Sequence, residues 1–589
     1  MGKVDFNYDG FQGSLSPIRY ADGKTLAQIP QVDFPDMARR ALRYLENNPE
    51  PDNGWECLFS FAPLCCPPLQ PVIPGQEGYI DPIAVGDTES RNDMAFNMML
   101  AVAGQEGGSD AQERVHERLL SYVRKEGKGA GLCWNRAYNA SLCDHKDYAS
   151  FWATGMLLQS ECDRFRQGKR EALPVMRQLF EGVAAFAAHR DGRAYFPVDG
   201  SFFDETGHGT ECYKGHYQAI LGPLCEYYLV TRDRRCWDLL TELAEGLLYD
   251  LTPHMLHRED GGLDGHNHVQ LHAVRGMAQF AYLSRNPRYI AWVKAIYDFY
   301  RGWALDTGWL PEARELPEHN SHSETCLNAD MLEIEAWLAL CGYTNLWDRV
   351  DRAIRNYFLP CQFTVTPALE SLYRRVNAAA HSEQEIEEGL RFLHRLEGGF
   401  ISAVTPVDKV FTVEEGHSHF GSVVYEGKTI VFDMMGCCPP EGMRAIYYAW
   451  RCTAEEKEDG MAIHLPYTVD APGASVAARP DGMRVLARRA GTYYLRVPAW
   501  APRDKVRLLL RGEEAPILWG GASNNYVVAG PIYPGDTLEL AYPVAEFWQE
   551  NDVQLEGHAP QKVSYHWVGN TVVEAKPEAE FIPLYPRRG

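Results

Sequence analysis

Apolar residues recur at intervals of three and four from about residue 33 to residue 360, and short stretches rich in Gly, Pro, Asp and Asn interrupt them. This spacing places apolar side chains on one face of a helix. It predicts helices near 34–47, 88–104, 111–124, 147–166, 170–189, 214–231, 235–250, 268–284, 288–303, 325–341 and 345–358. A twelfth is expected from Pro439-Pro440 to about residue 450, because proline is tolerated in a first helical turn.

Twelve helices in consecutive hairpins predict six pairs that close into an (α/α)6 barrel. A superhelical repeat protein is the alternative, but the sequence shows no motif with a fixed period of about 30 to 50 residues. The predicted barrel domain covers residues 1–455 and includes a short-strand excursion near 398–435.

Short alternating runs separated by turns dominate after about residue 455 and predict a C-terminal β-sandwich over residues 456–589. The fold class is therefore mainly α with appended β. The expected strands include 400–404, 409–413, 421–425, 493–497, 506–510 and 537–540.

The composition and net charge disfavour several classes of protein. Hydrophobic residues make up 45% and charged residues 23%, as in folded globular proteins. The net charge of −23 disfavours binding of nucleic acid or anionic lipid through a general basic patch. No long apolar run and no N-terminal signal pattern is visible, so we expect a cytoplasmic protein without a membrane span. The oligomeric state stays open, with a homodimer among the alternatives.

The chain has 15 cysteines, and the tetrapeptide Cys-Cys-Pro-Pro occurs twice, at residues 65–68 and 437–440. An odd number of cysteines without an export signal favours thiols or metal ligands over a disulfide framework. Cys437-Cys438 precedes a predicted helix, whose N-terminus stabilises a thiolate. Cys65-Cys66 lies in a proline-rich loop. Either pair could instead be two small apolar side chains buried in the core. Local sequence does not show which of the two pairs is the functional one.

Carboxylates near residue 320 are the next candidates. Glu324 and Cys326 form a Glu-x-Cys string at the start of a predicted helix, and both residue types bind zinc. The alternative is that Glu324 stands there because the helix dipole stabilises a negative charge in the first turn. Hydrolysis of a glycosidic bond needs one proton donor near the leaving oxygen. Glu312, Glu315 and Glu318 are candidates for that donor, with simple solvation as the alternative reading.

Histidines gather in two places. His216 follows a glycine in a predicted helix, and His266, His268 and His272 lie close together. His268 and His272 are four residues apart, so they share a helix face. The Glu of a zinc-protease H-E-x-x-H string is Val269 here, which argues against a metalloprotease. These histidines either hydrogen-bond a polar ligand or cap loops.

Taken together, these strings resemble glycoside hydrolase family 127, the β-L-arabinofuranosidases and their relatives. The similarity covers roughly residues 205–545. In chain order, the matching strings are Gly215-His216 followed by Tyr227-Tyr228, His272-Ala273-Val274-Arg275, Glu324-Thr325-Cys326, Gly436-Cys437-Cys438-Pro439-Pro440 with Arg444, and Arg496-Val497-Pro498-Ala499-Trp500. The asparagine that follows Cys-Cys-Pro-Pro in the family is Glu441 in this chain.

The resemblance implies a Zn²⁺ site and a retaining mechanism. The implied zinc ligands are Glu324, Cys326, Cys437 and Cys438, which favours this cysteine pair over Cys65-Cys66. Cys437 would be the nucleophile and Glu312 the acid/base, with Glu315 as the alternative. The implied substrate-binding residues are His216, His268, His272 and Arg275.

The expected function is therefore a retaining exo-glycosidase that removes a terminal sugar from plant-type oligosaccharides, with β-L-arabinofuranose as the first choice. Two alternatives remain. One is another sugar-active (α/α)6 enzyme, such as a lyase or an unsaturated-uronide hydrolase. The other is a non-catalytic carbohydrate-binding protein with a structural zinc.

Overall fold

The computed structural model describes the chain in ten stretches, which together include nearly all of the predicted elements. The described residues are 11–58, 60–68, 88–135, 147–198, 202–208, 219–249, 267–313, 321–413, 421–553 and 559–585. Among the helices in these stretches, none combines the length and apolar character that a bilayer span requires.

Six helices of the described chain form a closed inner ring. In ring order they are α3 (Glu89–Ala103), α6 (Phe151–Arg166), α8 (Leu221–Thr231), α10 (Asn267–Ser284), α13 (Thr325–Leu340) and α18 (Cys438–Arg451). Each contacts the next, and α18 returns to α3. An outer helix precedes each inner one: α2 (Phe34–Asn47), α4 (Asp110–Ser121), α7 (Ala172–Phe186), α9 (Arg234–Leu248), α11 (Pro287–Arg301) and α14 (Leu346–Ala353). The predicted (α/α)6 barrel is confirmed.

The sequence pattern explains which helices lie inside. In α13 every residue except Leu340 is buried, so this helix packs on all sides. In α2 the buried residues follow a single stripe that includes Met37, Ala41 and Leu45, and the opposite face is polar. An all-round buried helix belongs to the inner ring, and a one-sided helix belongs to the outer ring.

The structure differs from the prediction between residues 354 and 413. After α14 the chain continues through a π-helical turn (Ile354–Phe358) and α15 (Leu359–Cys361). It then forms two helices that the sequence analysis missed, α16 (Pro367–Asn377) and α17 (Glu383–Arg395). The expected strand at 400–404 is an extended segment, in which Phe400 forms an isolated bridge with Gln362. The expected strands at 409–413 and 421–425 are β11 (Phe411–Val413) and β12 (Ser422–Tyr425), and both pair with β13 (Lys428–Val431), which was not predicted.

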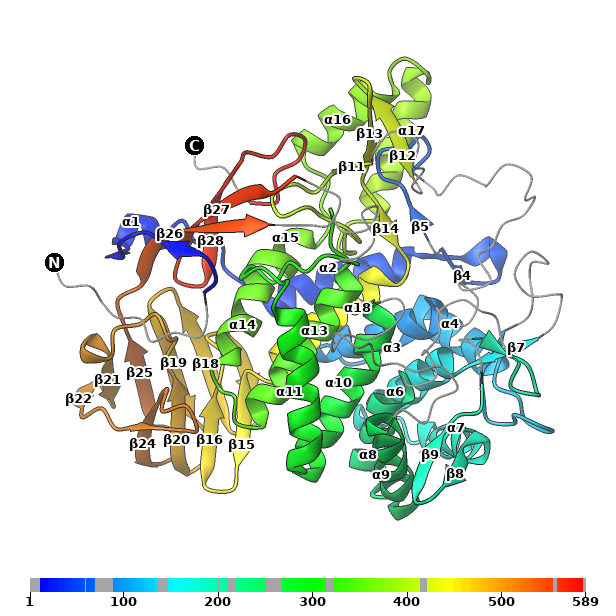
Figure 1. Ribbon diagram of the computed structural model, residues 1–589, viewed down its shortest axis with the longest axis horizontal. Coiled ribbons are helices and arrows are strands. Elements are labelled where there is room, and N and C mark those ends of the chain that lie inside the picture. Colours follow the sequence, from blue (N-terminus) through cyan, green and yellow to red (C-terminus); the bar gives the residue numbers. More distant parts are fainter. Residues whose placement is uncertain are drawn as a thin grey trace.

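The predicted β-sandwich is confirmed, and it lies to one side of the barrel (Figure 1). One sheet has the order β15 (Ala454–Lys457), β16 (Gly460–Ile463), β20 (Gly491–Arg496), β24 (Tyr526–Ile532) and β23 (Trp519–Gly520). The other has the order β17 (Val469–Ala471), β18 (Ala474–Arg479), β19 (Gly482–Ala487), β25 (Thr537–Ala541), β21 (Arg507–Leu510) and β22 (Glu513–Ala515).

A third sheet joins the two termini of the described chain. Its strands are β1 (Ser14–Leu15), β2 (Arg19–Tyr20), β26 (Ala545–Val553), β27 (Gln561–Val568) and β28 (Thr571–Lys576). Both β1 and β2 pair antiparallel with β26. The division of the chain into domains at residue 455 stays a prediction.

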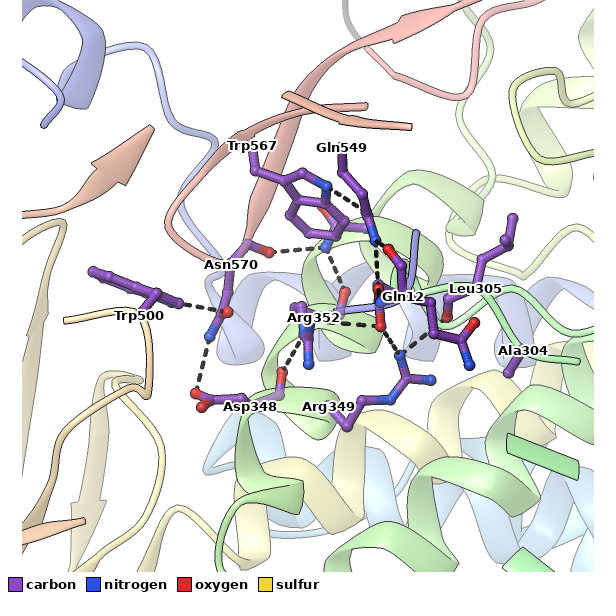
Figure 2. Close-up of polar contacts among 12 residues, drawn as sticks. Gln12, Ala304, Leu305, Asp348, Arg349, Arg352, Trp500, Gln549, Trp567 and Asn570 are labelled. Carbon is purple, nitrogen blue, oxygen red and sulfur yellow. Dashed lines mark hydrogen bonds and ion pairs between the residues drawn. The ribbon is translucent and has the colours of Figure 1, made fainter. Parts of the chain in front are cut away.

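Buried polar contacts fasten the barrel to the β-rich part (Figure 2). Asp348 of α14 accepts a hydrogen bond of 2.5 Å from Nη1 of Arg496, and both side chains are almost completely buried. Asn570 donates to Asp351 at 2.8 Å. Gln549 of β26 donates to Asp306 at 2.5 Å. The two parts therefore share an interface of buried polar contacts.

Candidate active site

Two neighbouring inner helices begin at the same point and bring four predicted ligands together. Glu324 is the N-cap of α13, and Cys437 is the N-cap of α18. The ligand atoms of Glu324, Cys326, Cys437 and Cys438 all lie within 4.8 Å of one another. The Sγ atom of Cys438 lies 3.2 Å from that of Cys326 and 3.9 Å from that of Cys437. The Glu324 side chain makes no capping hydrogen bond to its helix, so it is not explained as a helix cap.

The extended segment at 400–404 holds these two helix starts side by side. The backbone N–H of Thr325 donates to the carbonyl of Ser402 at 2.8 Å. On its other side, Ser402 N–H donates to the carbonyl of Asp433 at 3.1 Å, and the Ser402 hydroxyl accepts from Met435 N–H. Because its partners lie on both sides, this segment acts as a spacer between the two ligand pairs.

The three thiols have unequal surroundings. Burial raises the pKa of Cys326 and of Cys438 well above the usual range. The pKa of Cys437 lies well below its usual range, because the other two thiols hydrogen-bond to it and Arg91 and His268 add positive charge. Cys437 is also only half-buried, whereas Cys326 and Cys438 have no exposed surface. Cys437 is therefore the most acidic and the most exposed of the three thiols.

The donor set fits zinc. Zinc prefers tetrahedral sites of thiolate, imidazole and carboxylate ligands, whereas calcium and magnesium prefer oxygen alone. A tetrahedral site with Zn–S bonds of about 2.3 Å places sulfur atoms roughly 3.8 Å apart. The two sulfur separations of 3.2 and 3.9 Å bracket this value. In the described chain, Cys65 and Cys66 belong to no such group, and the Cys66 thiol instead contacts the carbonyl of Glu385.

Glu312 lies beside the start of α13. Its backbone N–H donates to the carbonyl of His322 at 3.1 Å, and its Oε2 lies 3.0 Å from Nε2 of His322. The ring of His322 stacks on Phe411, with centroids 4.1 Å apart. The Glu312 side chain is 22% exposed, so it has both a fixed partner and access to solvent. Glu315 and Glu318 lie outside the described residues, so the choice of Glu312 stays a prediction.

Three predicted substrate-binding residues, His268, His272 and Arg275, lie on α10 and are buried in the barrel. His268 Nδ1 lies 2.7 Å from Oδ2 of Asp330 on α13. His272 and Arg275 line a small cavity within the barrel. His216 and His266 lie outside the described residues.

A buried ion cluster that forms part of the cavity wall was not predicted. It consists of three arginines, Arg91, Arg275 and Arg444, and three carboxylates, Asp330, Glu333 and Glu441. Burial raises the pKa of Glu333 to about 7 and that of Glu441 to about 8, against the lowering effect of the arginines.

This ion cluster bears on a second group of possible metal ligands. His268, His272 and Asp330 also have ligand atoms within 4.8 Å. However, Arg275 and Arg444 lie 3.3 and 3.0 Å from Oδ1 of Asp330. Their positive charge opposes a cation there, so this group is better explained as an ion-pair network.

The sequence contains part of the information that predicts this ion cluster. Asp330 and Glu333 interrupt the otherwise apolar run of α13, and a charge inside such a helix needs a partner. The partners are distant in sequence, however: Arg91 and Glu441 are 350 residues apart. Local sequence identifies a charge that must be paired but does not identify its partner.

The chain resembles known proteins in its fold but not detectably in its overall sequence. No family model matches the sequence, and no curated protein matches it. Among solved structures, the chain is similar to a GH127 β-L-arabinofuranosidase from Geobacillus stearothermophilus T6, with a TM-score of 0.54 and 15% identity, covering 95% of this chain and 86% of that one. This chain shares its fold. A second GH127 β-arabinofuranosidase has a TM-score of 0.53 and 13% identity over 94% of this chain and 83% of its own. A third structure, a glycoside hydrolase, has a TM-score of 0.52 and 12% identity over 83% and 77%.

Proposed function

We propose that this protein is a retaining exo-glycosidase that uses Cys437 as nucleophile and takes a terminal β-L-arabinofuranose as its first substrate. The observation that carries the proposal is the convergence of Glu324, Cys326, Cys437 and Cys438 at the starts of two inner helices. The fold shared with two β-arabinofuranosidases supports the same reaction class.

The four residues would hold one Zn²⁺. Bound zinc keeps coordinating thiols deprotonated near neutral pH. The chain itself already favours a thiolate at Cys437, through hydrogen bonds from Cys326 and Cys438 and through two helix N-termini. Because Cys437 is half-buried while its two sulfur neighbours are fully buried, the group has one accessible side. Four protein ligands would fill a tetrahedral zinc, so the proposed catalytic role rests on the accessible Cys437 thiolate itself and not on an open metal position.

The reaction proceeds in two displacements. The Cys437 thiolate attacks the anomeric carbon, a C–S bond forms, and the glycosidic C–O bond breaks. Glu312 donates its proton to the departing oxygen. In the second step Glu312 removes a proton from water, the water oxygen attacks the anomeric carbon, and the C–S bond breaks. The contact between Glu312 and His322 keeps this carboxyl group beside the start of α13.

The barrel interior favours a neutral sugar over a uronide. We assign His268, His272 and Arg275 to the sugar hydroxyls. Arg275 already contacts three carboxylates, Asp330 and Glu441 at 3.3 Å each and Glu333 at 3.5 Å. A guanidinium that is neutralised in this way gives little binding energy to a second carboxylate on the substrate.

Release of nitrophenol from nitrophenyl β-L-arabinofuranoside by the zinc-loaded protein tests the proposal. We expect turnover with retention of the anomeric configuration, which NMR of the first-formed product reports. Cys437→Ala should lower kcat by at least about a thousandfold. The matched control is Cys65→Ala, from the other Cys-Cys-Pro-Pro string, and it should keep full activity. Sugar binding without turnover would refute the proposal in favour of a non-catalytic binding protein, and a product that absorbs in the ultraviolet would indicate a lyase.

A further inference from the structure

Glu441 lies at the centre of the buried ion cluster and contacts arginines from three inner helices. Its Oε1 accepts from Arg91 of α3 at 3.2 Å. Its Oε2 lies 3.3 Å from Nη1 of Arg275 of α10 and 2.8 Å from Nη2 of Arg444 of α18. Glu441 has no exposed surface. Since the three guanidinium groups repel one another, this carboxylate is a main reason that they stay together in the barrel.

Two of these arginines support the imidazole of His272. Arg275 Nη2 contacts Nε2 of His272 directly. On the other side, the guanidinium of Arg91 lies 4.1 Å from the centroid of the Trp152 ring, and that ring lies 4.1 Å from the His272 ring. Both routes from Glu441 to His272 therefore pass through an arginine that Glu441 holds. The His272 side chain itself lines the cavity.

We propose that Glu441 is a positioning residue for the sugar: through Arg91 and Arg275 it fixes the orientation in which His272 meets a sugar hydroxyl. This inference rests on the proposed function, because it takes His272 as a residue that binds the sugar. It differs from a purely structural role in one measurable respect. A structural carboxylate affects stability alone, whereas a positioning carboxylate affects binding through His272 and becomes irrelevant to binding once His272 is removed.

A double-mutant cycle tests this difference. The probe is 1,4-anhydro-L-arabinitol, a furanose analogue without a leaving group, and its affinity is measured by calorimetry on the zinc-loaded full chain. Glu441→Gln keeps the shape of the side chain and, at pH 9, above the raised pKa of Glu441, removes its negative charge. We expect this variant and His272→Ala each to weaken binding about tenfold, and the double variant to bind no more weakly than His272→Ala alone.

Glu226 provides a matched control. It is a buried carboxylate of α8 in a second ion cluster of the barrel, where it contacts Arg166 of α6 and Arg451 of α18. Glu226→Gln should lower the unfolding midpoint and leave the affinity for the analogue unchanged, alone and in combination with His272→Ala.

Three outcomes would overturn the inference: losses that add in the double variant, a Glu441→Gln variant that loses stability but binds the analogue normally, or a wild-type protein that does not bind the analogue. If Glu441→Gln does not fold, Glu441→Asp takes its place in the cycle, since it keeps the charge but draws the carboxylate away from the arginines; additive losses would again overturn the inference. Wild-type protein that binds the analogue but hydrolyses no arabinofuranoside would refute the proposed function alone.

Discussion

His116 of the outer helix α4 lies between two carboxylates of the inner ring and should stabilise the barrel as a cation. Its Nδ1 lies 3.0 Å from Asp93 of α3, and its Nε2 lies 3.1 Å from Glu161 of α6. Both ring nitrogens face acceptors, so both carry a proton. Burial alone would lower the pKa of His116, but Asp93 and Glu161 outweigh it and raise the pKa to about 10.

The magnitude follows from linkage. A pKa raised from 6.5 to about 10 means that the folded state binds the proton more tightly than the unfolded state. At about 1.36 kcal/mol per pKa unit, the contribution of His116 to the free energy of unfolding is roughly 5 kcal/mol. This contribution is fully present below pH 6.5 and is lost as the pH rises towards 10.

Urea unfolding of His116→Gln and of the wild type between pH 6 and pH 10 checks this reasoning. Glutamine can still donate to a carboxylate but carries no charge. We expect the variant to be less stable at pH 6 by several kcal/mol, and the difference to shrink by about 1.4 kcal/mol per pH unit above pH 6.5. His394→Gln, at an exposed histidine of α17, should show no such trend. A difference between His116→Gln and wild type that stays constant from pH 6 to pH 10 would refute the cationic assignment.

Three further predictions concern the candidate site and the interface. Glu312→Gln should keep more activity on a nitrophenyl glycoside than on a disaccharide, because a good leaving group needs little protonation; equal losses on both would contradict the assignment. Chelation of the zinc-loaded protein should lower its thermal midpoint, and Cys326→Ala should abolish that difference. Arg496→Met leaves Asp348 buried without its cation and should cost about 3–5 kcal/mol in urea unfolding. The exposed Arg507→Met should cost less than about 1 kcal/mol, and similar costs for both would be contrary to expectation.

The sequence predicted the barrel well because its helices alternate between two simple burial patterns. The helices that it missed, α16 and α17, had clear local signals. Thr366 caps α16 directly before a proline, and Ser382 and Glu385 form a reciprocal capping box at the start of α17. Both helices lie outside the six consecutive helix pairs of the barrel, so the hairpin pattern does not predict them. The segment at 400–404 was misassigned for a different reason: alternation predicts an extended chain but does not say whether its partners form a ladder.

The candidate site was predictable only in part. Glu324 and Cys437 stand at helix starts, but local sequence did not distinguish Cys437-Cys438 from Cys65-Cys66. The family resemblance implied the set that the structure brings together. The role of Glu441 was not visible, because it depends on arginines that three separate helices deliver to one point. A buried charge is a long-range property, and its partners are decided by the closure of the ring.

The pairing of β1 and β2 with β26 has a consequence for the order of events during synthesis. Arg19 and its partner Glu546 are 527 residues apart. At about 5 to 20 residues per second, a ribosome needs roughly 25 to 100 s to make the chain between them. All six inner helices emerge within that interval, so the ring can close while residues 14–20 still lack their partner strand. Pairing of residues 14–20 with β26 is therefore a late step of synthesis and folding. Until it occurs, that edge of β26 can pair with another nascent chain.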